Sequence, residues 1–439
     1  MLLIYNTLSQ EKEIFKPIHP GKIDFYVCGI TVYDYCHIGH ARVYLVFDTI
    51  IRYLRYRGFE VNYIRNITDI DDKIIKRADE NQEPMEILTE RFINAMHEDF
   101  AALNIEPATL EPRATEYVPQ MITLIKTLMD KGYAYVGANG DVYYKVEKFE
   151  SYGCLSHRKM DDLQAGARIG INESKQHPFD FVLWKSAKVG EPSWASPWGP
   201  GRPGWHIECS AMAHDYLGKH IDLHGGGMDL IFPHHENEIA QSEGLFGSPF
   251  STFWIHNAFV RINQEKMSKS LNNFFTLRDV FAQFDPMVVR FYYLQHHYRG
   301  PLDFSFEGLE AAQKAYQKLC ATYGGEYGVI IKEDFKDNTF FNELMALIGD
   351  DLNTVGAIGL LFSQQEQDFE TRAAGKLFLQ SVLGLSLKPL PKKTIVLTPE
   401  IERLITEREA ARIAKDWKKS DALRTKLIEL GYEVQDGRS

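Results

Sequence analysis

The sequence has few cysteines, and no two of them lie close together along the chain. Five occur among 439 residues, with no Cys-x-x-Cys pair. This argues against a disulfide framework and a conventional closed zinc site, and it favours a reduced, cytoplasmic protein. No apolar run reaches the ~20 residues of a membrane span, and residues 1–7 lack a charged leader. We therefore expect neither membrane insertion nor secretion. The cysteines are Cys28, Cys36, Cys154, Cys209 and Cys320.

The chain also lacks a global excess of basic residues. Its formal net charge is −11, so nucleic-acid binding would need a local basic surface. The run His224-Gly-Gly-Gly227 is similar to an esterase oxyanion loop, but no Gly-x-Ser-x-Gly accompanies it, which excludes that type of hydrolase. The length predicts more than one domain.

The tetrapeptide His37-Ile38-Gly39-His40 stands where a predicted strand gives way to a predicted helix. Residues 23–27 are typical of a strand, and residues 39–58 follow a helical period. A helix N-terminus attracts phosphate oxygens, and two imidazoles can donate to a phosphate whose charge grows during reaction. Alternatively, the histidines cap the helix or belong to the core, and the isolated tetrapeptide favours that interpretation.

A second motif, Lys266-Met-Ser-Lys-Ser270, follows in a polar stretch. Lys266 and Lys269 can hold the charge of a leaving pyrophosphate without acting as acids. Taken alone, the motif could equally be a solvated basic loop. Together and in this order, the two motifs predict two halves of one nucleotide site, in which a triphosphate undergoes attack.

These motifs resemble those of the class I aminoacyl-tRNA synthetases, and longer stretches match the cysteinyl-tRNA synthetase family. One difference is Asn272-Asn273, where the family usually has Gly-Asn. The resemblance implies an α/β fold: a Rossmann-type parallel-sheet catalytic domain with an inserted subdomain, followed by a C-terminal α-helical domain. It implies catalysis by His37, His40, Lys266 and Lys269, and ATP binding by Gly39, His37, His40, Asp229 and Lys269. The matching stretches are 26–33, 66–73, 202–210 and 224–238.

A possible metal site involves Cys28, Cys209 and a histidine-rich stretch. His234 and Glu238 are four residues apart, which places them on one helical face. Spacing alone does not select the ligands among His214, His220, His224, His234 and His235, and the cysteines could be small buried apolar residues. The resemblance implies one zinc ion per chain, held by Cys28, Cys209, His234 and Glu238.

Zinc would explain how cysteine is distinguished from serine. A soft metal binds a thiolate far better than a hydroxyl, whereas shape alone separates such pairs only roughly 10–200-fold. The resemblance also places Thr68 and Trp205 near the amino acid and Asp229 near the adenosine. The acidic run 68–72 could bind magnesium or neutralise a helix start. We expect Mg²⁺ to accompany ATP.

The C-terminal end predicts a helical hairpin with a local positive charge. Between residues 408 and 426 there are seven basic and three acidic residues. Ser420 is expected to cap the second helix and Gly431 to end it. Composition alone favours a solvated helix face, but the resemblance implies anticodon binding, for which we select Arg412, Trp417 and Arg424.

The pattern of the sequence predicts six segments along the chain and individual elements within them. Residues 354–369 are expected to form one helix, and residues 253–261 a strand. The segments are a first catalytic half (1–115), an inserted subdomain (116–205), a second catalytic half (206–305), a helical bundle (306–386), a linker (387–398) and the anticodon-binding region (399–439).

The predicted function is a cytoplasmic, monomeric cysteine–tRNA ligase. It would activate L-cysteine with ATP to cysteinyl-adenylate and transfer the cysteinyl group to tRNA(Cys). One alternative is a cysteine–amino-sugar ligase on the same core, which would not need the basic hairpin. Another is an inactive RNA-binding paralogue, which the two intact motifs disfavour.

Overall fold

The computed structural model describes residues 2–159, 174–262, 265–266, 274–327, 335–364, 368–390 and 399–429. The chain divides into two compact units, Met1–Lys388 and Pro389–Ser439. Among the described helices, none is both long and apolar enough to cross a membrane. The division between the units falls within the predicted linker.

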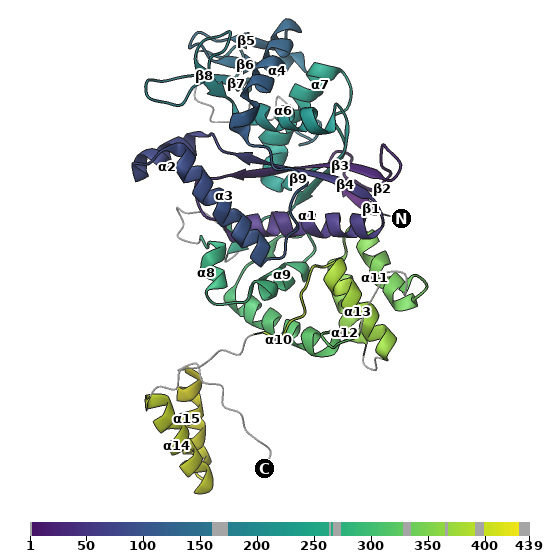
Figure 1. The fold of residues 1–439 in the computed structure, drawn as a ribbon, viewed down its shortest axis with the longest axis vertical. Helices are drawn as coiled ribbons and strands as arrows, with labels where there is room; N and C mark the ends of the chain where they lie inside the picture. Colours follow the sequence, from purple (N-terminus) through teal and green to yellow (C-terminus); the bar gives the residue numbers. More distant parts are fainter. Residues whose placement is uncertain are drawn as a thin grey trace. The chain divides into compact units, whose positions relative to one another are not determined.

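A parallel sheet of four strands lies at the centre of the first unit, in the order β10-β9-β3-β4. Strands β3 and β4 are buried on both faces, and the helix α1 connects them. Helices α1 and α6 lie on opposite sides of this sheet (Figure 1). Gly225 of β9 allows α1 to pack closely, because a Cβ there would lie 2.3 Å from the Phe47 ring. The elements are β3 (Lys22–Thr31), α1 (Ile38–Tyr56), β4 (Glu60–Thr68), α6 (Trp205–Leu217), β9 (Ile221–Gly227) and β10 (Ser251–Asn257).

An antiparallel sheet, β5-β6-β7-β8, separates the two halves of the parallel sheet along the chain. A tight turn at Asn139-Gly140 joins β5 to β6, with Gly140 at φ +82°. This sheet shares one hydrophobic core with α4, α6 and α7, which lie beside it in Figure 1. The bounds are α4 (Val118–Asp130), β5 (Ala134–Val136), β6 (Val142–Tyr144), β7 (Phe181–Ser186), β8 (Gly201–Pro203) and α7 (Glu236–Phe246).

The remaining elements of the first unit include short strand pairs and a helical region. They are β1 (Leu3–Asn6), β2 (Glu11–Ile14), α2 (Asp72–Asn81), α3 (Met85–Ala102), η1 (Ala114–Tyr117), η2 (Val146–Lys148), η3 (Met228–Leu230), η4 (Ile231–His235), β11 (Val260–Ile262), β12 (Glu265–Lys266), α8 (Leu277–Phe281), α9 (Pro286–Leu294), β13 (Leu302–Asp303), α10 (Phe306–Tyr323), α11 (Thr339–Gly349), α12 (Thr354–Ser363) and α13 (Phe369–Ser381).

Two predicted elements of this unit are wrong in extent. The strand expected over 253–261 is two strands, because β10 ends at Asn257 and β11 pairs in a different sheet with β12 and β13. The helix expected over 354–369 ends at Ser363, where Gln364 turns to ψ 102°. A separate helix, α13, then begins with Asp368 as its cap, whose side chain accepts the Thr371 N–H at 2.7 Å.

The second unit is the predicted helical hairpin, α14 (Pro399–Ile413) and α15 (Trp417–Glu429). A small core of Ile401, Leu404, Leu423 and Leu427 holds the pair together. Ser420 is not the cap of α15, because the helix begins three residues earlier and Asp416 accepts the Lys419 N–H at 3.1 Å. Gly431 lies outside the described residues.

Candidate functional site

The first histidine motif lies at the start of α1, and its side chains close the end of the helix. His37 precedes α1, and its Nδ1 accepts the backbone N–H of Gly39 at 3.1 Å and of His40 at 3.2 Å. In return, the Nδ1 of His40 accepts the His37 N–H at 3.4 Å. The two rings stack with their centroids 3.6 Å apart. The two histidines therefore form a capping box.

This geometry alters the interpretation of the motif. The amides of Gly39 and His40 donate to His37, and that of Ile38 donates to the Phe275 carbonyl at 3.2 Å, so these three are not presented to a phosphate as the sequence suggested. A neutral imidazole whose Nδ1 accepts a hydrogen bond carries its proton on Nε2. Burial, followed by the charge of His37, lowers the pKa of His40 well below its usual value. At pH 7, His40 is therefore a neutral Nε2–H donor.

The segment that follows the second motif, residues 274–277, contacts the first motif. Strand β12 ends at Lys266, and residues 267–273, which include Lys269 and Asn272-Asn273, lie outside the described residues. The chain that continues from them runs along the start of α1. The Phe274 ring meets the His37 ring edge-on at 5.3 Å, and the Leu277 N–H donates to the Cys36 carbonyl at 2.8 Å.

Four side chains expected to bind metal meet in the interior. Cys28 comes from β3, Cys209 from α6, and His234 and Glu238 from the chain around the start of α7. One donor atom from each lies within 4.8 Å of all the others, and all four residues are buried. The two Sγ atoms are 3.8 Å apart, about the separation expected for two thiolates on a tetrahedral zinc with Zn–S bonds of ~2.3 Å. The donor set therefore fits a zinc ion.

A second group of donors overlaps the first. Cys28, His224, His235 and Glu238 also lie within 4.8 Å of one another. The His224 Nε2 is 2.9 Å from one carboxylate oxygen of Glu238, and the His234 Nε2 is 3.0 Å from the other. His224 and His235, which the sequence alone could not separate from His234, thus surround the same carboxylate.

The ionisable groups of the cluster shift one another's pKa values. Although burial disfavours charge, Glu238 and Cys209 raise the pKa of His234 to about 10. Burial also opposes ionisation of Cys209, but its hydrogen bond with Cys28 and the charge of His234 lower its pKa to about 6. Burial, together with Cys209, raises the pKa of Cys28 well above its usual value. Metal binding would therefore release protons from Cys28 and His234.

Of the two residues predicted to bind the amino acid, Trp205 lines a cavity beside this cluster, and Thr68 is hydrogen-bonded to Glu208, which also lines it. Trp205, the first residue of α6, is 41% exposed and stacks on His234 with ring centroids 4.4 Å apart. Thr68, buried at the end of β4, donates to the Glu208 carboxylate at 3.0 Å. Trp205 and Glu208 line a cavity of 240 Å³, together with Asp71, Asp72, Lys185 and Arg202 among others.

Asp229 lies in the turn η3, which follows the glycine-rich end of β9, and it is exposed. A Cβ on Gly227 would come within 2.4 Å of its Oδ1, so the glycine permits this close turn. The carboxyl ends of parallel strands, where β9 ends, are where open α/β sheets bind ligands.

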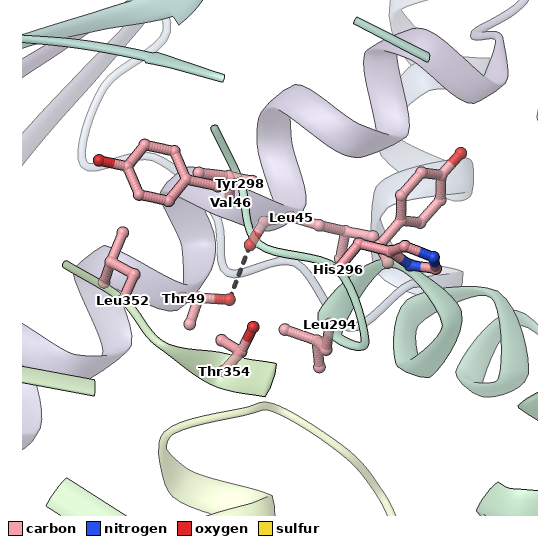
Figure 2. Close-up of a pocket in the computed structure, with 9 residues that line it drawn as sticks. Leu45, Val46, Thr49, Leu294, His296, Tyr298, Leu352 and Thr354 are labelled. Carbon is pink, nitrogen blue, oxygen red and sulfur yellow. Dashed lines mark hydrogen bonds between the residues drawn. The ribbon is translucent and has the colours of Figure 1, made fainter. Parts of the chain in front are cut away.

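A different small pocket, drawn in Figure 2, contains none of the predicted residues. It lies between α1 and the segments around Leu294 and Thr354, and the Thr49 hydroxyl on its wall donates to the Leu45 carbonyl at 2.8 Å. Its volume of 20 Å³ is about that needed for a single water molecule, which excludes a nucleotide.

The predicted RNA-binding residues lie on the second unit. Trp417, the first residue of α15, is 59% exposed, and Arg424 on the same helix is also exposed. Arg412 is half-buried near the end of α14.

Sequence reasoning missed Glu208 and Asn66, which connect the predicted residues. Asn66 accepts the Gly29 N–H at 2.7 Å through its Oδ1, which lies 3.6 Å from the Cys209 Sγ. Both residues fall within stretches that resemble the family, and that position was the available signal.

Comparison with known proteins identifies the family. The family described as "tRNA synthetases class I (C) catalytic domain" matches residues 14–314, and "Cysteinyl-tRNA ligase anticodon binding domain" matches residues 396–439. The cysteine–tRNA ligase of Laribacter hongkongensis is 50% identical over 448 residues, covering 100% of this chain and 98% of the relative. The cysteine–tRNA ligase of Dichelobacter nodosus is 51% identical over 452 residues, covering 99% of this chain and 97% of the relative.

Solved structures agree on the fold. Methionyl-tRNA synthetase of Mycobacterium tuberculosis, in complex with methionyl-adenylate, matches with a TM-score of 0.59 at 13% identity, covering 83% of this chain and 92% of that one. The leucyl-tRNA synthetase of Agrobacterium radiobacter K84 matches with a TM-score of 0.55 at 12% identity, covering 85% and 84%. The parallel sheet, the match to the family's two domains and the near-complete match to its relatives lead to one conclusion: the chain belongs to the cysteine–tRNA ligase family of class I aminoacyl-tRNA synthetases.

Proposed function

We propose that this protein joins L-cysteine to tRNA(Cys) in two steps, and that the buried donor cluster selects the cysteine thiol. The observation that supports the second part is the meeting of Cys28, Cys209, His234 and Glu238 beside Trp205 and the 240 Å³ cavity. Cysteine, ATP and tRNA are the substrates that the family and its anticodon-binding domain imply.

The cluster is proposed to hold one zinc ion. Two thiolates, an imidazole and a carboxylate suit zinc, and the pair of thiolates favours this set over Cys28, His224, His235 and Glu238. When bound there, zinc supplies a soft Lewis acid that prefers the substrate thiolate to a hydroxyl. His224 holds the second carboxylate oxygen of Glu238, which orients the carboxylate toward the cluster.

The amino acid is proposed to lie between the cluster and the nucleotide. Trp205 covers His234 and lines the cavity, so its ring can close over the substrate side chain. Thr68 reaches the same cavity through its hydrogen bond to Glu208. The substrate carboxylate is the nucleophile, and no protein side chain needs to form a covalent intermediate.

ATP, accompanied by Mg²⁺, is proposed to bind across the start of α1. His37 and His40 would donate from Nε2 to the α-phosphate as its charge grows in the transition state. Lys266 and Lys269 would hold the leaving phosphates. Gly39 leaves room for the phosphates, and Asp229, at the end of β9, would contact the adenosine.

The second unit is proposed to bind the anticodon arm. Trp417 can stack on a base, and Arg412 and Arg424 can contact phosphates. The local charge excess on this hairpin contrasts with the chain's overall −11.

One pair of assays tests the proposal. ATP–pyrophosphate exchange should depend on cysteine, and charging should occur with tRNA(Cys) transcript. Serine replaces cysteine as a control in both. Exchange without charging would support the cysteine–amino-sugar ligase instead, and the absence of cysteine-dependent exchange would contradict the proposal altogether.

A further inference from the structure

Glu236, the first residue of α7, has a fully buried carboxylate with no role in the chemistry described so far. It lies two residues from His234 and two from Glu238. At ~100° per residue, its side chain points about 200° away from each of them around the helix. Burying a carboxylate is costly unless hydrogen bonds satisfy it. Its partners therefore lie behind α7, on the side away from the metal donors.

Those partners come from one loop of the antiparallel subdomain. The Glu236 Oε1 accepts the N–H of Gly153 at 2.8 Å and of Leu155 at 3.5 Å, and its Oε2 accepts the N–H of Ser156 at 2.8 Å. Gly153 has φ +100°, and a Cβ there would lie 2.1 Å from the Arg158 carbonyl oxygen. Only glycine suits this turn, so the loop has a fixed shape that gathers amides around one carboxylate.

Further bonds attach the same subdomain to α7. The Tyr152 hydroxyl donates to the Asn237 Oδ1 at 2.5 Å, and the Tyr144 hydroxyl donates to the Ala240 carbonyl at 2.7 Å. On its other side, α7 is tied to the helix that carries Cys209, because Gln241 Nε2 donates to the Ser210 Oγ at 2.9 Å. Helix α7 is thus held between the loop and α6.

We propose that Glu236 is a positioning residue for the metal site. Together with the loop 152–156, it fixes the start of α7 so that His234 and Glu238 meet Cys28 and Cys209 in one geometry. The inserted subdomain then sets the metal affinity, and through it the affinity for cysteine. This inference rests on the proposed function, since it concerns the ligands assigned there.

The test compares zinc affinity in full-length variants by competition with a chromophoric chelator. Glu236→Gln replaces an acceptor oxygen by an NH₂ group, which cannot accept the hydrogen bond from the Ser156 N–H. Gly153→Ala disturbs the loop without touching α7. Glu243→Gln is the matched control, because the Glu243 carboxylate also accepts a backbone N–H, that of Phe250 at 3.2 Å, at the far end of α7. Thermal unfolding followed by circular dichroism confirms that each variant folds.

We expect Glu236→Gln and Gly153→Ala to weaken zinc binding about 10–100-fold, as the loss of groups that orient metal ligands usually does. The KM for cysteine should rise while that for ATP stays the same, and Glu243→Gln should behave as the wild type. Wild-type zinc affinity in both test variants, or an equal loss in the control, would overturn the inference. Cys209→Ser, measured in parallel, separates the two claims: if it retains full zinc affinity, the proposed ligand set itself is wrong.

Discussion

Replacing His40 by alanine should affect adenylation much more than stability. The substitution removes a ring stacked on His37 and the Nδ1 that accepts the His37 N–H. That bond is long, at 3.4 Å, so its loss should cost at the low end of the capping range, about 0.5–1 kcal/mol. The other cap bonds, from Gly39 and His40 N–H to His37, remain.

The kinetic cost should be larger because the Nε2–H acts on charge that develops in the transition state. Removing one such preorganised donor lowers kcat by about 10²–10³, or about 2.7–4 kcal/mol. Since burial lowers the pKa of His40, the residue stays neutral, and its donor capacity should not change as the pH falls from 8 to 6. The KM for cysteine should be nearly unchanged, because the donor cluster lies elsewhere.

The assay is ATP–pyrophosphate exchange at saturating cysteine, with thermal unfolding of the same preparations. His40→Gln is the matched control, because its amide offers an N–H at similar reach and should recover part of the rate. If the folded alanine variant exchanges pyrophosphate at the wild-type rate, the role assigned to His40 is wrong.

Three further predictions concern the metal, the second unit and an ion pair. Purified protein should contain about one zinc per chain by metal analysis, and Cys209→Ser should lose it; less than a tenth of an equivalent in the wild type would contradict this. Deleting residues 389–439 should preserve exchange and abolish efficient charging, because that unit has its own core; normal charging would exclude its RNA-binding role. Although burial raises the pKa of Glu111, hydrogen bonds from His97 and Arg65 lower it to about 2. The Glu111 carboxylate should therefore add about 3 kcal/mol to the free energy of unfolding above pH 4.5, and this stabilisation should be lost as the pH falls toward 2. The Tm difference between wild type and Glu111→Gln should narrow over that range, and a constant difference would contradict it.

Local patterns in the sequence were enough to place much of the fold. A short apolar segment identified β3, which is buried on both faces, and apolar residues at helical spacing identified α1. The break between α12 and α13 was missed because apolar residues continue through Phe362, and the cap at Asp368 is recognisable only once the helix it starts is known. Ser420 was chosen as a cap over Asp416 for the same reason.

The sequence predicted which residues form the site better than it predicted how their side chains are arranged. The four-residue spacing of His234 and Glu238 indicated one helical face, but Cys28 and Cys209 are 181 residues apart, and only the tertiary fold brings them together. The capping role of His37 depends on its side-chain conformation, which no spacing encodes. Glu236 stands between two expected ligands in the sequence, yet it points to the opposite side, toward a loop about 80 residues earlier.

The central claim is that the buried cluster binds the substrate thiol, and a cobalt-substituted protein tests it most directly. Cobalt–thiolate bonds absorb in the near ultraviolet, so a third thiolate from the substrate should intensify that band. We predict that cysteine increases the absorption and that serine at the same concentration does not. An unchanged spectrum on adding cysteine, in protein that still activates cysteine in the exchange assay, would mean that the metal is structural and that the thiol is recognised elsewhere.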